Sequence, residues 1–229
     1  MKINRPTAVL LALTPLLLTN LPAAAQEDSN PTNSAPPLKE LMATNSVVTN
    51  TVGIVLVKIS DGLWAGKFET TQDAYEKVVH SNPSQFLGGE KPVDSVSWNA
   101  AMEFCQKLTD TEKADLPDGY KYSLPTQSQW LTLMGNASLS DAVMKLNGNY
   151  SSTETVGSKG ANNLGLYDTR GNVMEWCLDP LDQPYRVLRG GAWDTFLDVN
   201  ARPEFLWKTT PEKALNSFGF RVVLAGSAK

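Results

Sequence analysis

The segment Gly165–Asp179, which reads GLYDTRGNVMEWCLD, places Asp168 before a glycine turn and Glu175 after it. Gly171 and Asn172 favour a turn, in which main-chain carbonyl groups can point inward. The carboxylates of Asp168 and Glu175 would then converge on these carbonyls and form an oxygen-only cage, which suits a hard cation such as Ca²⁺. The alternative is a tight turn with a buried glutamate that pairs with an arginine, Arg170 or Arg189.

The first 25 residues have the three-part layout of a secretory signal peptide. Lys2 and Arg5 give a positive start, Ala8–Leu18 is an apolar run, and Ala23–Ala25 supplies small residues for cleavage. The run is shorter than the ~20 residues that span a bilayer. We therefore expect a periplasmic or secreted protein, with an uncleaved membrane anchor as the alternative.

The charge of the chain argues against a nucleic-acid partner. Without Lys2 and Arg5, the 20 basic residues fall to 18 against 24 acidic residues, a net charge of −6. An acidic chain gains little from neutralising phosphates. We also expect no transmembrane segment after signal cleavage, because no second apolar stretch is long enough.

The remaining chain divides into a linker and one domain. Residues 26–50 are rich in Asn, Thr, Ser and Pro, which predicts a disordered linker. Residues 51–229 are long enough for a single domain with a sizeable core. Within it, Val52–Ile59 is β-branched and apolar and predicts a strand, and Leu63–Phe68 predicts the return strand after the Asp61-Gly62 turn.

The other elements indicate an α+β class with much irregular structure. Helices are predicted after a Thr70 or Thr71 cap, over Trp98–Thr109, and from a Thr126 cap through Leu133. Short strands are predicted at Val187–Leu188, Gly190–Trp193 and Phe218–Leu224.

Two cysteines and one histidine have few assignable roles. An oxidising compartment permits a bridge between Cys105 and Cys177, and the alternative is two buried thiols. His80 stands in a polar turn without visible catalytic or metal-binding partners, so we expect it at the surface.

Two arginine-containing segments follow the acidic one. In RVLRGGAWD, residues 186–194, two glycines allow close approach of the backbone, and a strand bend beside packed tryptophans is the simpler interpretation. In FGFRVV, residues 218–223, Arg221 either is buried beside an acidic partner or lines a cleft.

These segments resemble motifs of the formylglycine-generating enzyme family, also called sulfatase-modifying factors. GLYDTRGNVMEWCLD resembles GLYDxxGNVWEW, RVLRGGAWD resembles RxxRGGSW, and FGFRVV resembles the GFR closing strand. Upstream, KFETTQDAYEKVVHSNPSQF, PVDSVSWNAAMEFCQKL and YSLPTQSQW resemble three further motifs in the family's order. The resemblance runs from about Ile54 to Leu224.

The resemblance implies a fold related to C-type lectins, with bound calcium. By position, one calcium site falls on the side chains of Asp168 and Glu175 and on the carbonyl groups of Gly171 and Val173. We expect the family's other site to be lost, because the segment after Asn149 is shortened and lacks its aspartate.

The resemblance fails at the catalytic residues. Catalytic members oxidise a sulfatase cysteine with O₂ at a copper-bound cysteine pair, but residues 192–210, AWDTFLDVNARPEFLWKTT, contain no cysteine. Thr195 and Asn200 stand roughly at the pair's positions, and neither is a soft thiolate ligand, so copper is not expected. Ala192 and Met174 also replace the serine and the first tryptophan of the family motifs. Val222 replaces a cysteine that in some members bridges to the position of Cys105.

The sequence therefore favours a non-catalytic, exported, lectin-like module over an enzyme. Its ligand would be a protein, peptide or glycan, and the residues that we expect to line its cleft are Arg189, Trp193, Asp194, Arg202 and Arg221. The alternative is a divergent enzyme acting on protein side chains, with acid–base groups drawn from Asp194, Asp198, Arg202 and Glu204.

Overall fold

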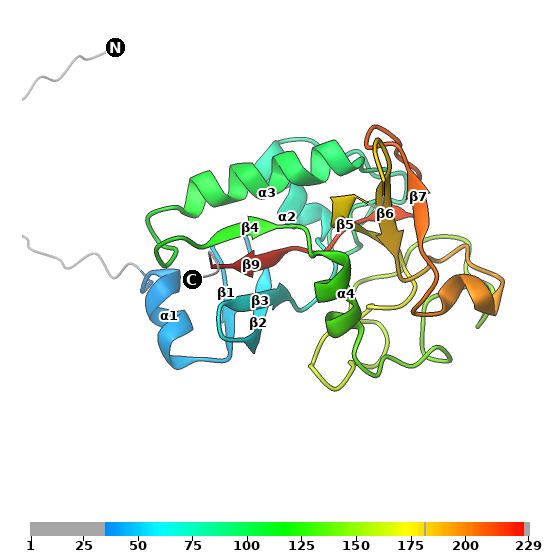
Figure 1. The fold of residues 1–229 in the computed structure, drawn as a ribbon, viewed down its shortest axis with the longest axis horizontal. Coiled ribbons are helices and arrows are strands. Elements are labelled where there is room, and N and C mark those ends of the chain that lie inside the picture. Colours follow the sequence, from blue (N-terminus) through cyan, green and yellow to red (C-terminus); the bar gives the residue numbers. More distant parts are fainter. Residues whose placement is uncertain (1–34, 181, 227–229) are drawn as a thin grey trace, which may run out of the picture. The chain divides into compact units, whose positions relative to one another are not determined.

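The computed structural model describes residues 35–180 and 182–226, and these form one unit from Pro36 onward. The predicted signal peptide, residues 1–25, and the first part of the predicted linker lie outside the described residues. The unit contains two small sheets, four α-helices and long irregular segments (Figure 1). This agrees with the α+β class expected from the sequence.

The first sheet joins the two ends of the domain. It has five strands in the order β1-β2-β3-β9-β4, all antiparallel. Their bounds are β1 Val47–Thr49, β2 Val55–Ser60, β3 Leu63–Gly66, β4 Lys121–Ser123 and β9 Val223–Ala225. The C-terminal strand β9 lies between β3 and β4 and so connects β4 to the N-terminal strands.

The second sheet holds the motifs of the C-terminal half. Its order is β7-β6-β5-β8, with β5 and β8 parallel and the other pairs antiparallel. The strands are β5 Met174–Pro180, β6 Arg186–Arg189, β7 Trp207–Thr209 and β8 Phe218–Gly219. A short 3₁₀ helix, η1, covers Asp198–Ala201.

Each predicted helix begins at a side-chain cap. Thr71 caps α2 (Gln72–Val79), Ser97 caps α3 (Trp98–Glu112), and Thr126 caps α4 (Gln127–Met134), in each case by accepting a main-chain N–H. Such caps satisfy amide groups that the first helical turn leaves without partners. His80 ends α2 in a left-handed conformation and is exposed, as expected.

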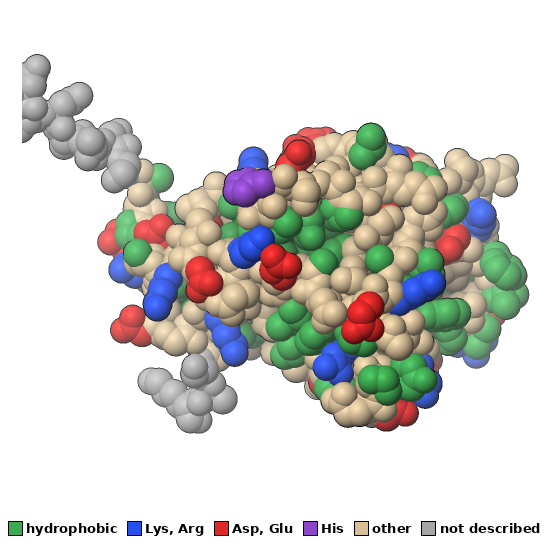
Figure 2. Space-filling model, turned by 90° about the horizontal axis from the view of Figure 1, so that it is seen from above, with side chains coloured by type: hydrophobic (Ala, Val, Ile, Leu, Met, Phe, Trp, Pro, Cys, Tyr) green, Lys and Arg blue, Asp and Glu red, His purple; other side chains and the backbone are tan. Residues whose placement is uncertain are grey.

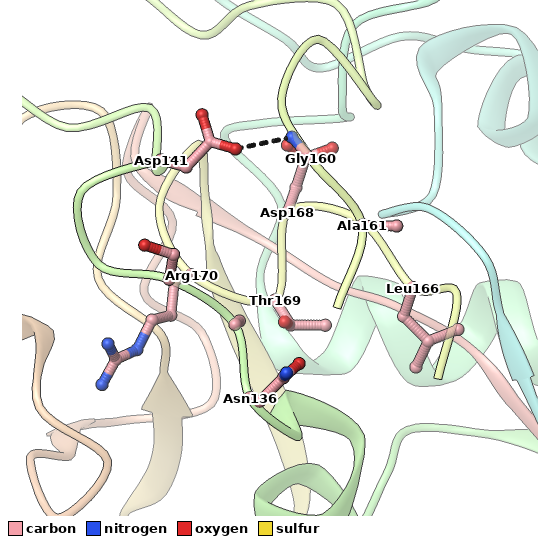
Figure 3. A pocket seen from close by; sticks show the side chains of 10 residues that line it. Asn136, Asp141, Gly160, Ala161, Leu166, Asp168, Thr169 and Arg170 are labelled. Atoms are coloured by element: carbon pink, nitrogen blue, oxygen red, sulfur yellow. Dashed lines mark hydrogen bonds between the residues drawn. The ribbon is translucent and has the colours of Figure 1, made fainter. Parts of the chain in front are cut away.

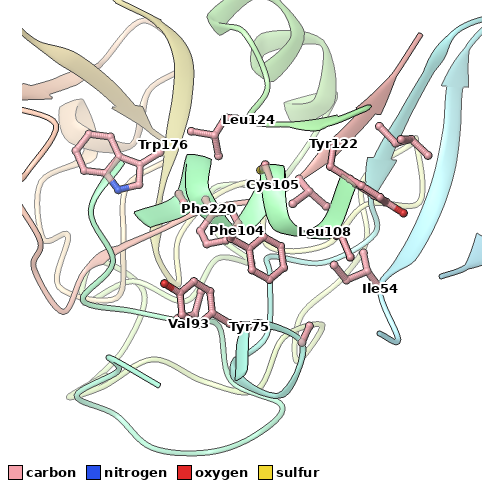
Figure 4. Close-up of a cluster of buried hydrophobic side chains, with 14 of the residues drawn as sticks. Ile54, Tyr75, Val93, Phe104, Cys105, Leu108, Tyr122, Leu124, Trp176 and Phe220 are labelled. Carbon is pink, nitrogen blue, oxygen red and sulfur yellow. The ribbon is translucent and has the colours of Figure 1, made fainter. Parts of the chain in front are cut away.

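The main core lies around α3. Figure 4 shows Phe104, Cys105 and Leu108 of α3 among aromatic side chains from distant segments. Phe104 stacks on Tyr75 at 5.4 Å between ring centroids and meets Phe220 edge-on at 5.3 Å. These contacts join α2, α3 and the segment between β8 and β9.

The predicted linker is wrong over its second half. Within residues 26–50, the structure forms α1 (Leu38–Thr44) and β1. Leu38 and Met42 are buried in the main core cluster, and β1 pairs with β2. Few apolar residues are needed here, because a neighbouring sheet edge supplies the hydrogen bonds and the core covers one face of the helix.

Two strand predictions also need correction. Gly190–Trp193 forms no strand, because Gly190 and Gly191 have φ of 98° and 72° and turn the chain out of the ladder. Phe218–Leu224 is not one strand, since β8 and β9 belong to different sheets. The paired strands at β2, β3 and β6 match their predicted positions closely.

Glu112, at the end of α3, fastens the turn between β1 and β2. It is buried, and its carboxylate accepts hydrogen bonds from the Tyr122 hydroxyl at 2.6 Å and the Thr51 amide at 2.9 Å. Asn50 adds a longer contact at 3.4 Å and also bonds to Ile54. A single carboxylate thus ties the end of α3 to the β1–β2 turn and to Tyr122 on β4.

We predict that Glu112→Gln destabilises the domain by about 1–3 kcal/mol, because the amide NH₂ would face donors in place of an acceptor oxygen. Urea unfolding at neutral pH measures the change. Glu76→Gln, an exposed substitution on α2, is the control. A Glu112→Gln variant as stable as the control would contradict this role.

Candidate functional site

The acidic segment is an unusual turn in the folded chain. Asp168, Gly171 and Asn172 all have left-handed φ, at 53°, 84° and 59°. A Cβ atom on Gly171 would lie 2.7 Å from the Val143 carbonyl oxygen, so only glycine fits there. Asn172 holds the turn by accepting the Glu154 amide at 2.9 Å.

Glu175 does not stand free in this turn but forms a buried ion pair with Arg221. The Arg221 guanidinium donates to Glu175 Oε1 at 2.7 Å and 3.1 Å, and the side chains are 0% and 1% exposed. The Trp130 indole N–H donates to the other oxygen at 2.9 Å. The arginine partner considered from the sequence was Arg170 or Arg189, and the structure assigns Arg221 instead.

Arg221 was also a candidate cleft residue, and this prediction is wrong. Its guanidinium is fully enclosed and also donates to the carbonyl oxygens of Gly66 at 2.9 Å and Tyr167 at 2.6 Å. Because the Arg221 side chain is 0% exposed, it does not line an open cleft. The other sequence-based expectation, a buried arginine with an acidic partner, is confirmed.

A third buried carboxyl, Glu69, was missed by sequence reasoning. It is 1% exposed and accepts from the Val173 amide at 3.0 Å and from Asn172 Nδ2 at 2.7 Å. Burial raises the pKa of Glu69 well above its usual range, and repulsion from Asp168 and Glu175 adds to the effect. Its position after a β-strand, in KFETT, was the available signal.

Three buried acids thus surround one buried arginine. Burial also raises the pKa of Asp168, with Glu175 contributing repulsion, while the Gly157 amide donates to Asp168 at 2.6 Å and opposes the rise. Burial disfavours charge on Arg221, yet the charge and hydrogen bonds of Glu175 raise its pKa. The site therefore has an excess of negative charge when its carboxylates are ionised.

Asp168 lines a small polar cavity of about 130 Å³. Figure 3 shows Asp141 and Asp168 approaching the turn at Gly160 from different loops, while Arg170 points away from them. The Gly160 amide donates to Asp141 at 2.9 Å. Within the described residues, no three His, Cys, Asp or Glu side chains group as metal ligands. A cation here would therefore depend on main-chain oxygens.

The predicted cleft around Trp193 is filled by protein side chains. Trp193 is 8% exposed, its indole donates to the Asn216 carbonyl at 3.1 Å, and its ring meets Phe86 edge-on at 5.2 Å. The Lys145 ammonium lies 4.9 Å from the same ring. The Trp193 ring is therefore covered by protein, with the Lys145 ammonium group over its face.

The remaining cleft candidates do not converge with Trp193. Arg189 is buried and donates to the Pro203 carbonyl and to Gln127, each at 2.9 Å. Asp194 is half-buried, and Arg202 is exposed and pairs with Asp198 at 2.9 Å. The side chains of Arg189 and Arg202 are thus bonded to neighbouring residues and do not face a shared cleft.

The acid–base alternative loses support for the same reason. Asp198, Arg202 and Glu204 are exposed, and Arg202 holds the pKa of Asp198 below its usual range. A general base or acid that works near neutral pH needs a raised carboxyl pKa.

The segment that follows the glycines at 190 and 191 exposes apolar side chains. Phe196, Leu197 and Val199 are 67%, 47% and 46% exposed, and we call residues 195–200 the apolar loop. At its start Thr195 is buried and accepts the Ala192 amide at 2.9 Å, so it closes a turn. Figure 2 shows hydrophobic side chains gathered at the end where Figure 1 draws this segment. Sequence reasoning missed this surface, although the FLDV run signalled it.

Cys105 and Cys177 are free buried thiols, so the bridge considered from the sequence is not present. Burial raises the pKa of both thiols. Buried, protonated thiols act as small apolar groups and are poor nucleophiles. Among the residues that the structure covers, no helix has the length and apolar character needed to cross a bilayer.

The fold is similar to that of solved structures. Treponema denticola variable protein 1 superimposes with a TM-score of 0.67 at 22% identity, over 80% of this chain and 100% of its own. At that identity the likeness shows the fold alone, which is the sulfatase-modifying-factor fold related to C-type lectins.

Residues 40–225 match the Sulfatase-modifying factor enzyme 1-like domain, and the chain belongs to this family. A relative from Paenibacillus barcinonensis, named Chaperone protein LppX, is 27% identical over 199 aligned positions, covering 60% of this chain and 71% of the relative. The Inactive C-alpha-formylglycine-generating enzyme 2 of Bos taurus is 30% identical over 155 positions, covering 58% of this chain and 50% of the bovine protein.

We predict that Glu175→Ala destabilises the domain by about 3–5 kcal/mol, because Arg221 would be left charged and unpaired in the core. Chemical denaturation measures the loss. Asp198→Ala, which removes an exposed ion pair, should leave stability unchanged. Equal stability of the two variants would show that the buried pair does not hold the core.

Proposed function

We propose that this chain is an exported, non-catalytic sulfatase-modifying-factor domain that binds a polypeptide ligand on a calcium-stabilised scaffold. The observation that carries the proposal is the apolar loop. It occupies the place of the family's cysteine-bearing loop, offers no thiolate, and exposes three large apolar side chains. Fold membership by itself does not confer the family's oxidase activity.

An exposed apolar loop favours a polypeptide over a glycan. Exposed apolar groups that stand together mark interaction sites, and aromatic anchors dominate the binding energy of protein interfaces. Phe196 is such an anchor, and Trp207 on the edge strand β7 is a second exposed aromatic at 44%. The names of two relatives, one a chaperone and one an inactive enzyme, support a binding role without catalysis.

The compartment follows from the first 25 residues. Their signal-peptide layout supports export to the periplasm or beyond the cell. A partner there would be an exported or surface polypeptide. Nucleic acid is not proposed, because the chain is acidic.

Calcium is proposed at the acidic turn, with Asp168 as its principal side-chain ligand. The donor set fits a hard cation, since it consists of carboxylates and turn carbonyls of Gly171 and Val173. Burial and repulsion from neighbouring carboxylates raise the pKa of Glu69 and Asp168, and a bound cation would relieve that repulsion. Glu175 fits less simply, because its two oxygens already accept from Arg221 and Trp130.

We predict that saturating calcium raises the melting temperature relative to the chelated protein by about 5 °C or more, since a ligand of the native state stabilises it by mass action. Differential scanning calorimetry with calcium or EDTA measures the difference. Asp168→Asn should abolish it. Asp141→Asn, at the mouth of the same cavity but outside the proposed ligand set, should retain it.

Substitution of Asp168 is a sharper test of calcium binding than substitution of Glu175, because Glu175→Ala breaks the ion pair with Arg221 whether or not calcium binds. A melting temperature that EDTA does not change would contradict the calcium proposal. It would leave Asp168 as a hydrogen-bonded turn residue.

We predict that the purified protein binds a reduced, carboxymethylated polypeptide that cannot refold, and that Phe196→Ser with Leu197→Ser weakens binding at least about tenfold by removing two apolar contacts. Fluorescence anisotropy of the labelled polypeptide measures the affinity. The matched control is Leu87→Ser with Leu131→Ser, two exposed leucines outside the apolar loop.

Equal weakening by both double variants would refute the assignment to the apolar loop. Copper-dependent O₂ consumption with a cysteine peptide would refute the non-catalytic proposal and favour a divergent enzyme that acts on protein side chains.

A further inference from the structure

A second site lies on α2, away from the residues of the apolar loop. A cleft of about 330 Å³ opens between α2, the start of β2 and the loop at residues 155–156. Its walls are mostly apolar, with Val55, Phe68, Ala74 and Val156 among the lining residues. This volume is within the range of sites that hold small organic ligands.

The cleft extends inward toward a buried carboxyl. A smaller cavity of about 30 Å³ is lined by Gly53, Val55, Phe68 and Thr71, which also line the larger one, and by Glu69. Phe68 is held in place by Tyr167, whose ring centroid is 5.1 Å away. The Phe68 wall of the cleft is therefore backed by a second ring.

Acidic and basic side chains both line the cleft. Asp73 and Glu90 supply carboxylates and Lys77 supplies an ammonium group. The Lys77 ammonium donates to the Val52 carbonyl at 3.1 Å, which places it at one side and leaves further N–H donors. The Asp73 amide donates to the Gly89 carbonyl at 3.0 Å.

The Asp73 carboxylate packs closely against Gly89. A Cβ atom on Gly89 would lie 2.2 Å from Asp73 Oδ1, so any other residue would displace this carboxylate. The arrangement is thus an apolar slot with a carboxylate pair and an ammonium group at its opening. Its complement is a ligand with an apolar body and both an ammonium and a carboxylate group.

We propose that this cleft binds a free α-amino acid with a large apolar side chain. The side chain lies against Val55 and Phe68. The ammonium group is held by Asp73 and Glu90, and the carboxylate is held by Lys77. This site is independent of the proposed polypeptide binding, because it shares no residue with the apolar loop.

Three related probes separate the contributions in isothermal titration calorimetry. L-phenylalanine carries both charges, phenethylamine lacks the carboxylate, and 3-phenylpropionate lacks the ammonium group. We expect phenylalanine to bind at least about fivefold more tightly than either single-charge probe, because each charge contributes an ion pair at a partly exposed site.

Substitutions in the cleft test which side chain binds each charged group of the ligand. Asp73→Asn should weaken phenylalanine and phenethylamine but not 3-phenylpropionate, whereas Lys77→Met should weaken phenylalanine and 3-phenylpropionate but not phenethylamine. Val156→Trp, a half-buried loop position, should fill the slot and remove binding of all three. Glu76→Gln, exposed on the same helix and outside the cleft, is the control.

Thermal unfolding of each variant shows whether its fold is kept. The proposal is overturned if phenylalanine does not bind the folded protein, if the three probes bind equally, or if folded Val156→Trp binds as before. Phenylalaninamide binding as tightly as phenylalanine would also overturn it, since a peptide N-terminus would then be the source of the ligand chemistry.

Discussion

The buried pair of Arg221 and Glu175 connects the parts of the domain that lie far apart in sequence. Arg221 precedes β9, and its guanidinium reaches Glu175 on β5, the Gly66 carbonyl at the end of β3 and the Tyr167 carbonyl in the acidic segment. One side chain therefore joins both sheets and the turn. A charge placed this deep needs a carboxylate partner and further acceptors, because desolvation is costly.

The buried ion pair constrains the acidic turn but not the apolar loop. The acidic turn must keep its conformation to present Glu175 to Arg221, and Gly171 meets a steric limit there. The apolar loop lies outside the pair, and its first residue, Thr195, is tied to the main chain of Ala192 and Leu146 by hydrogen bonds. A family domain can thus lose its thiolate chemistry and keep its fold, which agrees with the general separation of fold from function.

Local sequence patterns predicted α2, α3 and α4 well, because the caps at Thr71, Ser97 and Thr126 act within one turn. They missed α1, which has no side-chain cap. Strand β5 was read as a turn, because its residues 174–177 are buried on both faces and show no alternation. The family resemblance, now matched over residues 40–225, supplied the fold that these local patterns could not. The calcium ligands stay a prediction, and the cleft assigned to Arg221 failed because its depth depends on the whole fold.

The sequence by itself determined that the chain belongs to this family and that residues 192–210 contain no cysteine, since these depend on residue identity. It left Arg221 either beside a buried acidic partner or in a cleft. Only the tertiary structure decided that the partner is Glu175 and that Glu69 joins the same buried group. It also decided that Trp193 is covered while Phe196 is exposed. Burial and partner choice depend on segments more than forty residues apart, and a linear pattern does not record which of these segments meet.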